Sequence, residues 1–363
     1  MRRLRLGVIV ALALALTGSS LLELRSQTGP QPTRIFALSE PSSTAQPTVA
    51  PSATPISTPA PRPSSTPRPV PTPTPRQPAR PAGPVLAGCP MFPANNIWNT
   101  DISTLRVHPR SAQWTASMGT ANLHPDFGAP PYGYPYALVT NAHTRTYISF
   151  TYASESDRGP YPFGPDTPIE QGSDQHAFML NRSSCTLYEL FDASWNSGHP
   201  TAGSGAIFNL GSNALRPAGW TSADAAGLPM LPGLVRLDEV RSGAIHHALR
   251  FTASRTDRSY IWPARHQAGT ASDPGLPPMG ARFRLRASFN ISHYSPQAQV
   301  ILRAMQHYGM FLADNGSNWY FQGTDDPGWS DSLLSELKTV PSTAFDAVDE
   351  SSLMISANSG AAR

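Results

Sequence analysis

A proline-rich tract divides the chain and decides which part of it can fold. Residues 41–84 read PSSTAQPTVAPSATPISTPAPRPSSTPRPVPTPTPRQPARPAGP, in which Pro alternates with Ser, Thr and Ala. Proline fixes φ and lacks a backbone N–H, and the tract has too few apolar residues for a core, so it favours an extended polyproline II spacer. At about 3.1 Å per residue it reaches on the order of 100 Å. We expect residues 27–84 to be a disordered stalk and residues 85–350 to be the folded part.

The first residues have the pattern of an export signal. Arg2, Arg3 and Arg5 precede an apolar run that extends to about Leu22, which is typical of a signal peptide. The run is barely long enough to span a bilayer, since a span takes roughly 17–25 apolar residues. Residues 1–26 are therefore expected to be either a cleaved signal or an uncleaved membrane anchor, and the folded part to be secreted or extracytoplasmic.

The charge of the folded part argues against a nucleic-acid partner. Nine of the 27 basic residues and two of the 24 acidic residues lie in the first 88 positions, so 18 basic and 22 acidic residues remain, a net charge of −4. Lys338 is the only lysine, and no basic stripe is present. A nucleic-acid-binding domain normally carries such a stripe, so nucleic-acid binding is excluded.

Two cysteines in an exported chain indicate one disulfide. Cys89 stands at the start of the folded part and Cys185 lies within it. A bridge between them would close a long loop, which the chain-entropy model values at roughly 4–5 kcal/mol. We expect this bridge to be structural.

Alternation of apolar and polar residues with a period of two recurs after Cys89 and predicts a β-rich domain. Helices are few; Ser295 as N-cap, Pro296 and Gly309 delimit one, a second short helix starts at Ser330, and one further turn is expected from Ser222. The fold class is therefore mainly β, a single jelly-roll-like β-sandwich or an irregular β-barrel with a few peripheral helices. Residues 351–363 are expected to be a flexible tail. The predicted strands are 145–152, 175–181, 185–192, 205–210, 244–252, 259–262, 281–287, 310–314 and 318–322, the last two joined as a hairpin through residues 315–317.

The stretch AIHHALRFTASRTDRSYIWPARH, residues 244–266, concentrates histidines, arginines and aromatic side chains. If residues 244–252 and 259–266 pair as a hairpin, positions whose numbers sum to about 511 lie opposite each other and share a face. This register places His247, Leu249, Phe251, Tyr260 and Trp262 on one face, with His266 at the open end, and turns His246, Arg250 and Arg265 the other way.

His247 then has two interpretations. It is either a core histidine bonded to a backbone carbonyl, or it joins His266 in a groove floored by Tyr260 and Trp262. In the groove, imidazole acts as general acid or base and the rings stack on sugars, with Arg265 assigned to substrate binding.

Carboxylates and a further histidine give other catalytic candidates. Asp174 and His176 precede a strand, and Glu189 lies within one, three residues from Asp192 and therefore on the opposite face. A glycosidase needs two carboxyl groups roughly 5–10 Å apart, and each of these residues also has an ordinary use in a turn or cap. His176, His247 and His266 have no metal-ligand spacing, so no metal site is expected.

Loops supply the remaining candidates. Residues 123–136 and 153–176 are long and rich in Pro, Gly, Tyr and Asp, and we expect them to cap one mouth of the sheet. Asp314, Asn318 and Trp319 form an inventory suited to hydroxyl-rich ligands, although they also describe a tight hairpin. No G-x-S-x-G, P-loop or dinucleotide motif is present, and no cofactor is expected.

Four segments resemble a group of uncharacterised secreted bacterial proteins. They read NNIWNTDIS, GSGAIFNL, NALRPAGWTSADAAGLPMLPGLVRLDEV and YGMFLADNGSNWY. The resemblance covers residues 89 to about 350 and implies a self-contained module carried by the stalk. It brings no activity and no catalytic residues.

These features favour an exported, stalk-mounted domain that acts on or binds polysaccharide or cell-envelope glycan. As an enzyme it would be a glycoside hydrolase or a polysaccharide lyase. The alternatives are a non-catalytic carbohydrate-binding or adhesion module and a structural envelope protein. The sequence does not indicate an oligomeric state.

Overall fold

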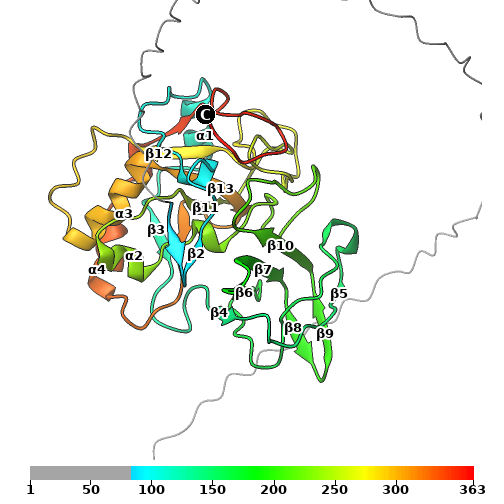
Figure 1. Ribbon diagram of the computed structural model, residues 1–363. Coiled ribbons are helices and arrows are strands. Elements are labelled where there is room, and N and C mark those ends of the chain that lie inside the picture. The colour runs from blue at the N-terminus through cyan, green and yellow to red at the C-terminus, as the bar shows by residue number, and fades with distance from the viewer. Residues whose placement is uncertain (1–82) are drawn as a thin grey trace, which may run out of the picture. The chain divides into compact units, whose positions relative to one another are not determined.

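The computed structural model describes residues 83–363 (Figure 1). This part of the chain is mainly β, with several sheets and few helices, as the alternating sequence predicts. Among the described residues the sheets do not close into a barrel, so the sandwich-like alternative describes the domain better. The expected signal and nearly all of the expected stalk lie outside the described residues.

The largest sheet has six strands and supplies much of the main core. Its order is β15–β12–β13–β11–β14–β3, with parallel pairing between β11 and β13 and between β3 and β14, and antiparallel pairing elsewhere. Because the sheet joins strands from both ends of the described sequence, residues 83–363 fold as one domain. The strands are β3 (His124–Asp126), β11 (Leu249–Ala253), β12 (Arg282–Leu285), β13 (Met310–Asn315), β14 (Tyr320–Gln322) and β15 (Phe345–Val348).

A four-stranded sheet lies between two cores. Leu187 of its strand β7 packs into the main core, whereas Tyr188 and Leu190 belong to a smaller second core. Strand β6 is buried along its whole length because both of its faces are covered, which explains why AFMLN is an apolar run rather than an alternating one. The order is β10–β7–β6–β4, with bounds β4 (Tyr136–Val139), β6 (Ala177–Asn181), β7 (Thr186–Phe191) and β10 (Ser204–Asn209).

Two smaller sheets complete the β structure. The three-stranded sheet adds Ala202 to the second core, with Trp195 packed against it. The two-stranded sheet at the start of the domain contains Cys89, which forms the predicted disulfide with Cys185, with an S–S distance of 2.09 Å. The bridge fastens the first strands to the turn between β6 and β7. The strands are β5 (Ser149–Phe150), β8 (Ser194–Asn196) and β9 (His199–Ala202) in one sheet, and β1 (Val85–Leu86) and β2 (Cys89–Pro90) in the other.

The helices lie at the periphery of the sheets (Figure 1). Both longer predictions are confirmed: the Ser295 hydroxyl accepts a hydrogen bond from the N–H of Ala298 in α3, and Ser330 caps α4. The turn expected from Ser222 is not helical. The helices are α1 (Ser111–Ser117), α2 (Leu237–Ser242), α3 (Pro296–His307) and α4 (Asp331–Leu337), with 3-10 turns η1 (Ile97–Asn99), η2 (Ala153–Glu155), η3 (Leu231–Gly233) and η4 (Ser342–Ala344).

The hairpin predicted between residues 244–252 and 259–266 is wrong. Strand β11 pairs with β13 on one side and β14 on the other, so no edge of it is left for residues 259–266. That segment instead exchanges backbone hydrogen bonds with Met279, next to a single bridge between Tyr260 and Met279, and its last residues donate to the Ala226 carbonyl. Pro263, which lacks an N–H, also interrupts any ladder there.

The hairpin predicted between β13 and β14 is also wrong, because β11 lies between them. The connection passes over the end of β11, where the N–H of Gly316 donates to the Ala253 carbonyl and the Thr252 hydroxyl donates to the Ser317 carbonyl. Asn318 accepts a hydrogen bond from the N–H of Ser254. A turn signal in the sequence was therefore correct about the turn and wrong about the pairing.

The C-terminal residues 351–363 pack on the domain rather than forming the expected flexible tail. Ala361 bridges Asn96, and the N–H of Ala362 donates to the Asn95 carbonyl. The guanidinium group of Arg265 donates to the Ala357 carbonyl at 2.5 Å. These contacts consume backbone groups that a free tail would expose to water, and they join the two ends of the described chain.

Candidate functional site

Two pockets lie side by side in the domain. The first, here called the Tyr134 pocket, has a volume of about 480 Å³, and the second, the Asp314 pocket, about 400 Å³. Asp174 and Asn315 line both pockets, so the two are adjacent, and together they are called the groove here. A groove of this size accommodates several rings of an extended ligand rather than one small ion.

Loops from different sheets form the walls of the groove. The loop after β3 supplies residues 131–134 and the loop before β6 supplies residues 170–174. The turn after β13 contributes residues 315–317, and segment 221–225 lines the Asp314 pocket. The two loops singled out in the sequence, 123–136 and 153–176, therefore both reach the groove.

The lining of the groove is acidic and aromatic. Neither pocket has an arginine or lysine in its lining, and one histidine, His266, is present. Aromatic side chains provide flat apolar faces with polar edges, which suits sugars. The carboxylates are Asp126, Glu155, Glu170, Asp174, Asp224 and Asp314, and the aromatic residues are Tyr132, Tyr134, Tyr152, Phe191 and Tyr320.

Asp314 is a carboxyl group at the end of β13 that lines the Asp314 pocket. Its Oδ1 accepts from its neighbour's N–H in Asn315 at 2.7 Å and its Oδ2 accepts from the N–H of Ala225 at 3.3 Å. Burial raises the pKa of Asp314, although Arg250 and His176 act in the opposite direction. A carboxyl group whose proton is retained to higher pH is suited to act as a general acid.

Asp224 lies deeper in the same pocket and is almost fully buried. Its Oδ1 accepts hydrogen bonds from the N–H groups of Ala226 and Leu228, which holds the loop in place of the helical turn expected there. Burial raises the pKa of Asp224 to about 7, against the effect of Arg250. Because Oδ1 is bonded to the loop and Oδ2 lies 3.4 Å from the guanidinium group of Arg250, Asp224 shapes the pocket rather than facing a ligand freely.

A buried arginine lies beneath the groove and connects its two pockets. Arg250 is fully buried; its guanidinium group donates to the Gln322 side-chain oxygen and lies 3.4 Å from Asp224 Oδ2. Gln322 lines the Tyr134 pocket and Asp224 the Asp314 pocket. Arg250 therefore contacts one lining residue of each pocket.

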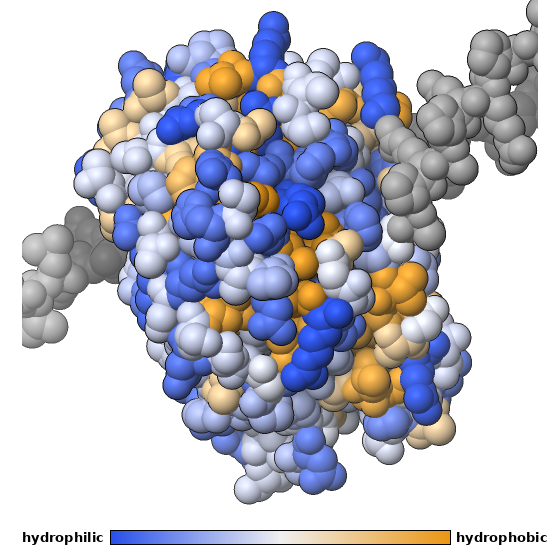
Figure 2. Space-filling view, turned by 90° about the vertical axis from the view of Figure 1, so that its left-hand side faces the viewer, coloured by the Kyte–Doolittle hydropathy of each residue, from blue (hydrophilic) through white to orange (hydrophobic). Residues whose placement is uncertain are grey.

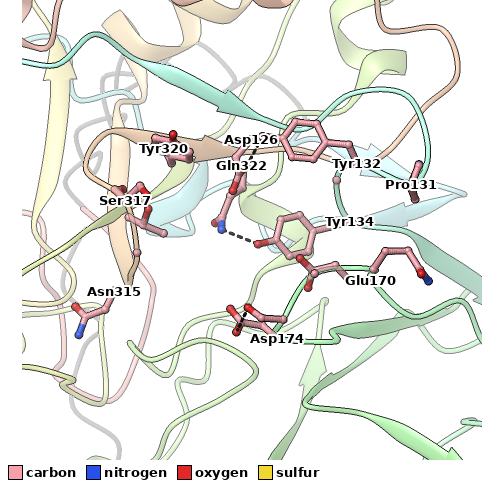
Figure 3. A pocket seen from close by; sticks show the side chains of 16 residues that line it. Asp126, Pro131, Tyr132, Tyr134, Glu170, Asp174, Asn315, Ser317, Tyr320 and Gln322 are labelled. Carbon is pink, nitrogen blue, oxygen red and sulfur yellow. Dashed lines mark hydrogen bonds between the residues drawn. The ribbon is translucent and has the colours of Figure 1, made fainter. Parts of the chain in front are cut away.

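Tyr134 takes the next place in this chain of hydrogen bonds. The Gln322 side-chain nitrogen donates to the Tyr134 hydroxyl oxygen at 2.6 Å, as Figure 3 shows. Burial places the pKa of Tyr134 well above its ordinary value of 10.0, although Arg250 lowers it. The phenol therefore keeps its proton.

Glu189, a catalytic candidate from the sequence, belongs to the main core and does not line either pocket. Both of its oxygens accept hydrogen bonds from the N–H of Met230, and Oε1 also accepts from the N–H of Leu231 at 2.8 Å. Burial raises its pKa to about 7, partly offset by these hydrogen bonds. Its position fixes the start of the η3 turn and removes it from direct contact with a ligand.

The structure separates the histidines that the sequence grouped. His266 lines the Asp314 pocket, with Nδ1 2.9 Å from the Ala225 carbonyl and Nε2 3.7 Å from Glu155 Oε2. His176 is buried, and its ring nitrogens lie 2.5 Å from Glu170 Oε2 and 3.0 Å from the Ala223 carbonyl. It therefore supports the loop before β6.

His247 is a core histidine, the plainer of its two interpretations. Its Nδ1 lies 2.8 Å from the Ala248 carbonyl and its Nε2 3.0 Å from Glu239 Oε2, with Arg236 2.6 Å from the other oxygen of that carboxylate. Burial alone would raise the pKa of Glu239, but His247 and Arg236 hold it below its ordinary value. This charged group stabilises α2 and takes no part in the groove.

The remaining sequence candidates have structural roles. Trp262 donates from Nε1 to the Ser359 carbonyl, Tyr260 packs against the main core, and Arg265 holds the C-terminal segment. Trp319 is fully buried among the phenylalanines of the six-stranded sheet. Asn318 holds the end of β11. The groove floored by Tyr260 and Trp262 does not exist, because the hairpin that would form it does not.

Sequence reasoning did not identify Arg250 and Gln322 as site residues. Both occupy strands, where a polar residue reads as the solvent-facing half of an alternating pattern. The sequence carried no signal for Arg250, because only the folded structure shows that β11 pairs on both sides and is buried throughout, and an arginine in such a strand needs buried partners. Tyr134 and Glu170 were within the two loops that the sequence did single out.

The chain matches no family model, no curated protein and no solved structure. Within residues 83–363, no three His, Cys, Asp or Glu side chains are arranged to hold a metal ion. No helix in that same range is long and apolar enough to cross a membrane. On the face shown in Figure 2, hydrophobic residues gather between polar ones, most of them near the middle and at the lower right. The groove is therefore the feature from which a function is best argued.

Proposed function

We propose that the protein is an exported glycoside hydrolase that binds a neutral glycan in the groove. The observation that carries the proposal is Asp314: a carboxyl group with a raised pKa that opens into a groove lined by tyrosines and by a second, exposed carboxylate, Asp174. Glycoside hydrolysis uses one protonated and one ionised carboxyl group on either side of the scissile bond. The pattern of an export signal and stalk in the sequence supports a location of such an enzyme at the cell surface.

The roles follow from the surroundings of the two carboxyl groups. Asp314 retains its proton to higher pH and donates it to the leaving glycosidic oxygen. Asp174 lies on the loop before β6, is exposed, and lines both pockets. It serves as the partner carboxyl group, either as nucleophile or as the base that activates water.

The charge of the groove favours hydrolysis over lyase chemistry. A polysaccharide lyase acts on uronic acids, whose carboxylates need a positive group beside them for proton abstraction to proceed. The lining has six carboxylates and no arginine or lysine. An anionic sugar would be repelled, whereas a neutral one would not.

A non-catalytic carbohydrate-binding module is the second candidate, and exposed tyrosines favour it. Tyr132 and Tyr152 are 46% and 52% exposed, and one lies in each pocket. Rings at such positions stack on sugar whether or not a bond is cleaved.

A screen of the purified protein against neutral and uronic-acid polysaccharides tests the proposal. Reducing ends should be released from a neutral glycan, without the absorbance of unsaturated products. Asp314→Asn and Asp174→Asn should each lower turnover by at least 10²-fold, while Asp166→Asn, on an exposed loop outside both pockets, should not. Binding without turnover would favour the module, and uronic-acid cleavage with unsaturated products would contradict the proposal.

A further inference from the structure

We infer that Tyr134 donates a hydrogen bond to an acceptor oxygen of the glycan, in an orientation imposed by the buried Arg250 through Gln322. The inference rests on the proposed function and names a specificity-determining residue of the same groove. It follows from which groups in the chain can donate and which can accept.

Arg250 sets the orientation of the Gln322 side-chain amide. A guanidinium group has five N–H donors and no acceptor, so the atom of Gln322 that faces Arg250 must be the oxygen, as the structure has it. Arg250 is fully buried, so water does not compete for this contact. Arg250 thereby fixes the amide orientation and turns its NH₂ group toward Tyr134.

The Gln322 amide in turn sets the direction of the Tyr134 hydroxyl proton. The Gln322 NH₂ group donates to the Tyr134 hydroxyl oxygen at 2.6 Å, so that oxygen is an acceptor in this contact. Its own proton must point elsewhere, and among residues 83–363 the Tyr134 hydroxyl makes no second hydrogen bond. Tyr134 lines the pocket named after it, and the proton is directed into that space.

The Tyr134 hydroxyl proton selects which ligand groups can bind beside it. A phenol that retains its proton donates one hydrogen bond and discriminates in favour of acceptors. A sugar hydroxyl, a ring oxygen or an N-acetyl carbonyl satisfies it, whereas a protonated amine does not. A ligand lacking an acceptor at this point would bury an unsatisfied phenol, which is the kind of mismatch that gives strong selectivity.

The variant Gln322→Glu tests the inference by reversing one bond. A carboxylate in place of the amide still accepts from Arg250, but it also accepts from the Tyr134 hydroxyl, so the phenol proton turns away from the pocket. Tyr134→Phe removes the proton altogether. The double variant Tyr134→Phe/Gln322→Glu should be no worse than either single one, because both changes remove the same hydrogen bond.

The matched control is Gln171→Glu. Gln171 lines the same pocket, and its side chain donates to the Ile169 carbonyl, without contact to Tyr134. It adds the same negative charge to the same space, so it separates an effect of charge from an effect of proton direction. Thermal unfolding of each variant of the full chain checks that it is folded.

Calorimetric titration with neutral hexasaccharides of glucose, xylose, mannose and N-acetylglucosamine provides the readout. For whichever one binds, Tyr134→Phe and Gln322→Glu should each weaken Kd roughly 3- to 10-fold, the range expected for one hydrogen bond. Gln171→Glu should weaken Kd less than Gln322→Glu does, and the difference between the two is the effect of proton direction. Equal Kd values for the wild type and both folded variants would overturn the inference while leaving the proposed function intact.

Neutron diffraction of the deuterium-exchanged protein separates the two ideas further. Deuterium on the Tyr134 oxygen directed into the pocket is the expected result, and deuterium directed at Gln322 would overturn the inference. If none of the four hexasaccharides binds, the neutral glycan fails as the ligand, and with it both the proposed function and the glycan as the acceptor for Tyr134.

Discussion

Removing the disulfide should destabilise the domain by a calculable amount. The bridge joins Cys89 to Cys185, which are 96 residues apart, and the chain-entropy model gives about 4.7 kcal/mol for a loop of that length. For a domain of this size that lowers Tm by roughly 10–20 °C. Cys89→Ala/Cys185→Ala, unfolded in urea and followed by tryptophan fluorescence, should show this loss of free energy of unfolding.

The wild type unfolded in the presence of a reductant is the control and should match the double variant. Alanine is the better replacement, because Cys89 is fully buried and serine would add a buried hydroxyl. The closed loop contains β3, β4, β5 and β6. The bridge stabilises the domain by restricting this long loop in the unfolded chain. A double variant within about 1 kcal/mol of the oxidised wild type would refute the argument from unfolded-chain entropy.

Three further predictions concern the groove and the charged core. If Asp314 is the general acid, the hydrolysis rate should fall as pH rises through the raised pKa of this group. This fall at alkaline pH should be absent from the residual activity of Asp314→Asn. An unchanged fall in the variant would assign the acid to another group. Glu239→Gln should cost about 3–5 kcal/mol in urea unfolding, because His247 and Arg236 stay buried without their carboxylate. Since the pKa of Glu239 is held below 4.5, the carboxylate should add to the free energy of unfolding above that pH, and this addition should be lost as pH falls through the lowered pKa. Equal stability of the variant and the wild type at neutral pH would contradict the prediction. Ser295→Ala should cost about 0.5–2 kcal/mol by removing the cap of α3, with helix content followed by circular dichroism, and no loss would show that Pro296 alone fixes the start.

Local patterns in the sequence predicted elements well and pairings poorly. Ser295, Pro296 and Gly309 bound α3 through capping, which depends on neighbours in the chain. The partners of β11 are β13 and β14, some 60 to 70 residues away, and alternation in the sequence does not contain their identity. The β13–β14 hairpin prediction therefore placed two real strands beside the wrong neighbours, and the other hairpin prediction paired β11 with residues 259–266, which form no strand.

The sequence predicted the loops that form the walls of the site but not the buried Arg250 beneath it. Asp174 was singled out before a predicted strand, in a loop expected to cap the sheet, and Asp314 at the end of another predicted strand, and both line the groove. Arg250 was assigned to the outward side of a strand whose two faces are in fact covered. A charged residue in a doubly covered strand becomes visible only when the second layer is known, because burial is a property of the assembled sheets.

The join between the two ends of the domain bears on the order in which the chain can fold. The N–H of Ile97 donates to the Gly360 carbonyl, and Ala362 donates to Asn95. During synthesis the early partner emerges more than 250 residues before the late one, so those contacts cannot form until the whole sequence between them has been made. A chain of this design completes its fold only after the last residues of the domain have been made.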